Sequence, residues 1–164
     1  MDIEIWFALA MKRGLLPPIE TGHMLSLDLG AGNTPVPGAE VLDYPEWKAP
    51  EPIPYGDASV GTVWAHHFFE HLSGHDAILT LREVQRVLRP RGLANIVVPY
   101  YSSQMQAQDL DHKSVWCEET WRNLFKNPYY TKEREEPWEL SVYTCFILGL
   151  NERNLALFTQ LRKE

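Results

Sequence analysis

The segment Met24-Leu25-Ser26-Leu27-Asp28-Leu29-Gly30-Ala31-Gly32-Asn33 decides the fold. Its apolar first half predicts a buried strand, and the glycines directly after Asp28 predict a sharp turn. Such a turn lets backbone N–H groups approach a ligand closely, while a carboxylate at the strand end accepts the ligand's polar groups. The run Glu40-Val41-Leu42-Asp43 predicts a second strand with a second acid at its end. Two such acids beside a glycine turn indicate a site for an adenosyl-type ligand, whose ribose offers two hydroxyls.

Length and composition predict one globular domain. The chain has 164 residues, 45% of them hydrophobic and 23% charged. A chain of this size buries roughly 70% of its extended surface, enough for a core. We expect a single domain over residues 1–164, made of an N-terminal docking helix and linker (1–23), a core (24–121) and a C-terminal hairpin region (122–164).

Charge and cysteine usage exclude several classes of protein. The net charge of −7 opposes non-specific nucleic-acid binding, which needs a positive field. The first residues, Met1-Asp2-Ile3-Glu4, are acidic where a signal peptide is basic, and no apolar run reaches the roughly 20 residues of a membrane helix. Cys117 and Cys145 are isolated, which fits a reducing compartment. We therefore expect a cytoplasmic protein that binds neither membranes nor nucleic acid non-specifically, with self-association left open.

Periodicity predicts the remaining elements. A proline-rich loop spans residues 35–57, with only the short strand noted above inside it. The pattern further predicts helices at 3–13, 76–88 and 120–125, buried strands at 61–65 and 93–98, and an antiparallel hairpin formed by 140–150 and 155–161. Strand, helix and strand in this order predict an α/β fold with a doubly wound, mostly parallel sheet that ends in an antiparallel hairpin.

The chain resembles the class I S-adenosylmethionine-dependent methyltransferases, a family with a Rossmann-like fold, from about Leu25 to Trp121. Five segments in the right order carry the resemblance: Leu27–Asn33, Val41–Asp43, Ile53–Ser59, Glu70–Leu72 and Glu83–Gly92. The resemblance implies a seven-stranded sheet and a small, short-looped member of the family. It also implies a transferase that moves a methyl group from S-adenosyl-L-methionine to an unidentified acceptor.

The resemblance assigns the cofactor to particular residues. They are Asp28, Gly30, Ala31, Gly32, Asn33, Asp43, Tyr44 and His66. In this assignment Asp28 helps to hold the ammonium group, Asp43 binds the ribose diol and Tyr44 lies against the adenine. His66, at the end of the third core strand, lies near the sulfonium.

Histidines are the candidates for acid–base chemistry. Methyl transfer needs a base only where the acceptor must lose a proton, and imidazole titrates near neutral pH. His67 and His66 are therefore the predicted catalytic residues. A metal is not expected, because the spacing of His67, Glu70, His71 and His75 is not His-Glu-x-x-His. His112 resembles a histidine at a similar place in related chains. The resemblance leaves two roles for it, reaching over the acceptor pocket or closing a loop, and we expect it to close a loop.

Two other functions remain open. A dinucleotide-dependent oxidoreductase requires a third glycine at position 35 and a later acid, whereas this chain has Pro35 and the early Asp43. The stronger alternative is a cofactor-binding but catalytically inactive regulatory or partner subunit. It is favoured by Gly61, which stands where the family usually has an aspartate.

Overall fold

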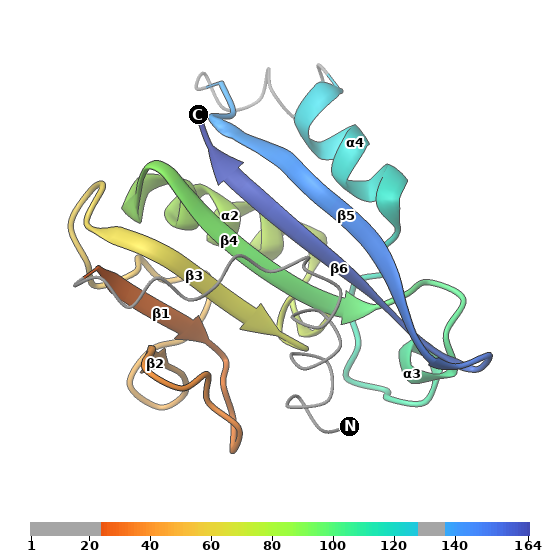
Figure 1. Cartoon of the computed structure of the whole chain (residues 1–164). Helices are drawn as coiled ribbons and strands as arrows, with labels where there is room; N and C mark the ends of the chain where they lie inside the picture. The colour runs from red at the N-terminus through yellow and green to blue at the C-terminus, as the bar shows by residue number, and fades with distance from the viewer. Residues whose placement is uncertain (1–23, 128–136) are drawn as a thin grey trace.

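The computed structural model describes residues 24–127 and 137–164 (Figure 1). The predicted helix at 3–13 lies outside these residues. The strands are β1 (Leu25–Leu29), β2 (Glu40–Leu42), β3 (Val60–His66), β4 (Leu88–Pro99), β5 (Leu140–Asn151) and β6 (Asn154–Lys163). The helices are the 3-10 turn η1 (Phe69–His71), α2 (Gly74–Val87), α3 (Gln104–Ala107) and α4 (Glu118–Lys126).

The strands form one mixed sheet in the order β2-β1-β3-β4-β6-β5. Strands β2, β1, β3 and β4 are mutually parallel, while β6 runs antiparallel to both β4 and β5. This arrangement confirms the predicted α/β fold and its C-terminal hairpin. In the described part of the chain, no helix has the length and apolarity needed to cross a lipid bilayer.

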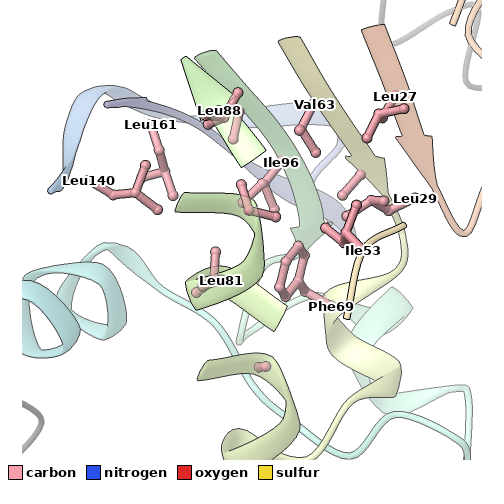
Figure 2. Close-up of a cluster of buried hydrophobic side chains, with 14 of the residues drawn as sticks. Leu27, Leu29, Ile53, Val63, Phe69, Leu81, Leu88, Ile96, Leu140 and Leu161 are labelled. Carbon is pink, nitrogen blue, oxygen red and sulfur yellow. The ribbon is translucent and has the colours of Figure 1, made fainter. Parts of the chain in front are cut away.

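Side chains of the central strands alternate between the two faces of the sheet, and both faces carry buried apolar clusters. On one face, helices α2 and α4 pack against the strands, and Figure 2 shows Leu81 of α2 and Phe69 of η1 among strand residues such as Ile96. The opposite face carries a smaller cluster that includes Trp64, Val97 and Phe158. This two-sided burial is the reason that the central strands read as continuous apolar runs.

Helix α2 begins earlier than its apolar pattern predicts. The Ser73 hydroxyl accepts a hydrogen bond from the Asp76 N–H at 3.1 Å and so caps the helix at Gly74. Ala77, Leu81 and Val84 then form its buried face. The helix ends where the chain turns directly into β4.

Six strands are described instead of the seven implied by the resemblance, and the segment before β3 explains the difference. Residues 43–59 form no strand, and side chains of α2 supply hydrogen-bond partners for backbone groups of this segment. The Ile53 N–H donates to Glu83 Oε2 at 2.9 Å, and Arg86 donates to the carbonyls of Ile53 and Tyr55, both at 2.9 Å. Arg86 also pairs with Asp57 at 2.8 Å, so Asp57 shapes this loop. The Arg86 guanidinium in turn lowers the pKa of Glu83.

Candidate functional site

The carboxyl ends of the parallel strands meet at one edge of the sheet, where the arrowheads of β1, β3 and β4 lie (Figure 1). After β1 the chain crosses to β2 on one side and then to β3 on the other. Such a reversal of strand order leaves a crevice at the carboxyl edge, the usual ligand site of open α/β sheets. Asp28, Asp43, His66 and His67 all lie at the ends of these strands.

The two glycines after β1 have different surroundings. Gly30 has φ +65°, and its N–H donates to the Leu42 carbonyl at 2.8 Å, which ties the turn to β2. The Phe68 ring lies against it, because a Cβ at Gly30 would be 2.3 Å from Phe68 Cδ2. Gly32 has φ +55° and open space where a Cβ would be. Gly30 is therefore a packing position, and Gly32 is the glycine that a ligand can approach.

Asp43 holds the turn from the end of β2. Its Oδ2 accepts the Gly32 N–H and its Oδ1 accepts the Tyr44 N–H, both at 2.8 Å. A carboxylate has about four acceptor sites, so the half-exposed Asp43 keeps capacity for a ligand's hydroxyls. The Tyr44 ring beside it is 78% exposed.

Asp28 is a buried acid with one unused oxygen. Its side chain is 1% exposed, and Oδ2 accepts the Val36 N–H at 2.8 Å. Oδ1 is buried and has no hydrogen-bond partner among the described residues. Burial raises the pKa of Asp28 to about 6, against the Val36 hydrogen bond that lowers it, and the charge of Asp43 raises it further. Asp28 Oδ1 can therefore accept a hydrogen bond from a positively charged group.

The remaining residues assigned to the cofactor lie in the same turn. Ala31 is buried, with 7% exposure, and its carbonyl accepts the Thr34 N–H at 3.2 Å. Asn33 is exposed at the tip of the turn. The structure therefore brings these residues together with Gly32 and Asp43 at one edge of the sheet.

His66 and His67, at the end of β3, differ in their surroundings. Burial, and then the neighbouring His67, lower the pKa of His66 to about 4, so this imidazole is neutral at pH 7. His67 has φ +52°, a strained backbone conformation for a residue with a side chain, and such strain often marks functional positions. Its Nδ1 lies 3.2 Å from Glu70 Oε1, and its buried Nε2 has no hydrogen-bond partner in residues 24–127 and 137–164. The pair has the arrangement of a base and the carboxylate that orients it.

A pocket of about 530 Å³ opens at the ends of β3 and β4. Its walls include His67, Glu70, His71, Met105 and His112. The sequence placed His67, Glu70 and His71 in one short segment, and the resemblance offered His112 as a residue that reaches over the acceptor pocket or closes a loop. In the structure His112 is a wall of this pocket. His75, which the sequence grouped with them, is exposed on α2 and is not a wall of this pocket.

Comparison with known proteins relates this site to methyltransferases. Residues 27–96, which run from the middle of β1 through β2 and β3 into β4, match the family model described as a methyltransferase domain. The chain also has the fold of many solved methyltransferases. The described residues therefore have the class I methyltransferase fold, and residues 27–96 match the sequence pattern of a methyltransferase domain.

Three solved structures illustrate the likeness of this methyltransferase domain. One is a chain of the complex between the Haloferax volcanii Trm112 methyltransferase activator and a methyltransferase, with 16% identity, 99% of this chain and 97% of that chain covered, and TM-score 0.62. An S-adenosylmethionine-dependent methyltransferase from Methanosarcina mazei has 12% identity, 90% and 98% coverage, and TM-score 0.60. Another from Archaeoglobus fulgidus has 12% identity, 99% and 95% coverage, and TM-score 0.59. No curated protein matches the chain.

The methyltransferase domain match and the S-adenosylmethionine-dependent neighbours support S-adenosyl-L-methionine as the cofactor, and the residues at the carboxyl edge fit it. Gly32 is open, Asp43 has acceptor capacity, and the buried Oδ1 of Asp28 needs a donor. We call these three residues the cofactor cradle. An ammonium group supplies both the hydrogen bond and the positive charge that Oδ1 lacks.

The different surroundings of the two glycines predict different costs of substitution. In this methyltransferase domain we expect Gly30→Ala to lower the free energy of unfolding by more than about 2 kcal/mol, because positive φ costs roughly 1 kcal/mol and the new Cβ meets Phe68. Gly32→Ala is the control and costs only the backbone term, about 1 kcal/mol. Urea unfolding without cofactor measures both.

A double variant tests the role of Phe68 in this difference. In a Phe68→Ala background, the cost of Gly30→Ala should fall to that of Gly32→Ala, because the steric overlap is gone. Equal costs for the two glycine variants in the wild-type background would contradict the contact.

The raised pKa of Asp28 predicts a pH-dependent stability. The folded state holds this proton up to about pH 6 and the unfolded state releases it near 3.8, so stability falls as pH rises through this window. Two pKa units correspond to about 3 kcal/mol. Because the lowered pKa of His66 changes stability in the opposite direction in both proteins, the test is the difference between them: from pH 4 to pH 7, urea unfolding should show the wild type losing about 3 kcal/mol relative to Asp28→Asn. The same pH dependence in both proteins would show that Asp28 titrates normally.

Proposed function

We propose that this domain is an active S-adenosylmethionine-dependent methyltransferase, with an acceptor that binds in the pocket beside β3 and β4. The observation that carries the proposal is the cofactor cradle at one end of β1 and β2, next to a histidine held by a carboxylate at the end of β3. Cofactor residues and a candidate base thus share one edge of the sheet.

In this proposal the acids of the cradle bind the two polar ends of the donor. Asp43 accepts the ribose hydroxyls while its existing hydrogen bonds keep Gly32 and Tyr44 in position. Asp28 accepts the ammonium group through Oδ1, and the exposed Tyr44 ring packs on the adenine. Gly30, covered by Phe68, contributes the shape of the turn.

The two histidines have separate roles in the proposed reaction. When bound, S-adenosylmethionine supplies an electrophilic methyl group on its sulfonium. The low pKa of His66 keeps its imidazole uncharged at pH 7, so it does not repel the positive sulfonium. The same low pKa makes His66 a weak base. His67 is the base, since Glu70 binds its Nδ1–H and leaves the Nε2 lone pair to take a proton from the acceptor.

Cofactor affinity tests the ribose role of Asp43. We expect Asp43→Ala to weaken binding of S-adenosylmethionine and S-adenosylhomocysteine by about 1 to 3 kcal/mol, because the ribose hydroxyls lose a charged acceptor. Isothermal titration calorimetry measures this change. Glu46→Ala, which removes a nearby exposed acid, is the control and should leave the affinity unchanged. An unchanged affinity in Asp43→Ala would refute the assignment.

Methyl transfer to a panel of oxygen, nitrogen, carbon and sulfur acceptors tests catalysis. For an acceptor that must lose a proton, His67→Gln should lower kcat by about 10²-fold or more, because the base is gone. The cofactor affinity should not change, because His67 is outside the cradle. Cofactor binding by the wild type without turnover on any acceptor would favour the inactive partner subunit.

A further inference from the structure

We propose that Glu70, His71 and His112 form a binding site for a divalent metal ion, of which Zn²⁺ is the best match. The three residues each offer one ligand atom, and these atoms lie within 4.8 Å of one another. They line the pocket at the ends of β3 and β4. The site goes beyond the proposed methyl transfer and does not depend on it.

Two segments that are distant in the sequence are held together at this point. The N–H groups of Lys113 and Ser114 donate to the Glu70 carbonyl, at 2.7 and 3.1 Å. The Ser114 hydroxyl donates to the Phe69 carbonyl at 3.0 Å. Five polar atoms of η1 and the 109–114 loop are thereby satisfied, so these hydrogen bonds hold the loop that carries His112 beside η1.

The His112 ring presents a lone pair to the cluster. Its Nδ1 lies 3.1 Å from the Gln106 carbonyl, and a carbonyl only accepts, so Nδ1 carries the hydrogen. In the neutral ring Nε2 is then the free ligand atom. A metal-binding histidine commonly donates its other N–H to a carbonyl in this way. The His71 ring packs edge-on against His112, with centroids 4.8 Å apart.

Glu70 supplies the independent observation that points to a cation. Its side chain is fully buried, with 0% exposure, and Oε1 faces His67 Nδ1 at 3.2 Å. Oε2 is buried and has no hydrogen-bond partner among the residues that the structure describes. A buried charged oxygen without a donor is costly. A cation between Oε2 and the two imidazoles removes this cost.

The ligand types favour zinc among common ions. Two imidazoles and one carboxylate form a zinc ligand set, with the fourth position left to water or substrate. Ligand atoms around tetrahedral zinc lie roughly 3.4 Å apart, so side-chain movements on the order of 1 Å close the cluster onto the ion. The pocket of about 530 Å³ leaves room for the fourth ligand. Asp109, 3.7 Å from His112 Nε2 and half-exposed, adds negative charge at the rim.

Zinc titration of the chelator-treated full chain, without S-adenosylmethionine, tests the site. We expect one Zn²⁺ per chain, and a loss of affinity of more than about tenfold in both His112→Ala and Glu70→Gln. The control is His75→Ala, which removes an exposed histidine of α2 and should bind zinc like the wild type. Circular dichroism of each variant shows whether the fold persists.

Two outcomes would overturn the site: no stoichiometric zinc binding by the wild type, or binding that folded His112→Ala retains in full. If Glu70→Gln fails to fold, His71→Gln replaces it, since His71 is partly exposed. Cofactor affinity measured on the same samples separates the two proposals. A chain that binds S-adenosylmethionine but not zinc refutes only the metal site.

Discussion

The burial of Phe69 positions the chemical groups at the end of β3. Its ring is fully buried in the main core, where Figure 2 shows it beside strand residues such as Ile96. Its centroid lies 5.4 Å from that of the Phe68 ring and 6.0 Å from that of the Trp116 ring. Removing such a ring from water contributes about 2 to 3 kcal/mol. Because Glu70 and His71 follow directly in the 3-10 turn, this packing also determines where their polar atoms lie. An apolar contact thus organises the polar site.

The charge pattern of the edge suits a positively charged donor. Burial, and to a lesser extent the charge of nearby Asp43, raise the pKa of Asp28, so the cofactor cradle brings two acids together. At the end of β3, burial lowers the pKa of His66 and keeps its imidazole neutral. The edge therefore attracts a cation toward β1 and β2 without placing a positive imidazole against it.

Local patterns were enough to predict the fold. The apolar run before Gly30, the face of α2 and the two runs of the hairpin each depend on residues close in sequence. The sequence did not reveal that Phe68 covers Gly30 or that the 109–114 loop pairs with η1, because both contacts join separate segments. The environment of Asp28 could not be predicted for the same reason, because the Val36 N–H, eight residues further along the chain, donates a hydrogen bond to Asp28 Oδ2.

The position of β6 has a consequence for biosynthesis. It is the last of the six described strands, yet it lies in the interior of the sheet, between β4 and β5. Until β6 leaves the ribosome, β4 has an open edge and β5 lacks its neighbour in the sheet. Open apolar edges invite pairing with other chains. A chain whose β6 has not yet been made is therefore more exposed to aggregation than one in which β6 has paired with β4 and β5.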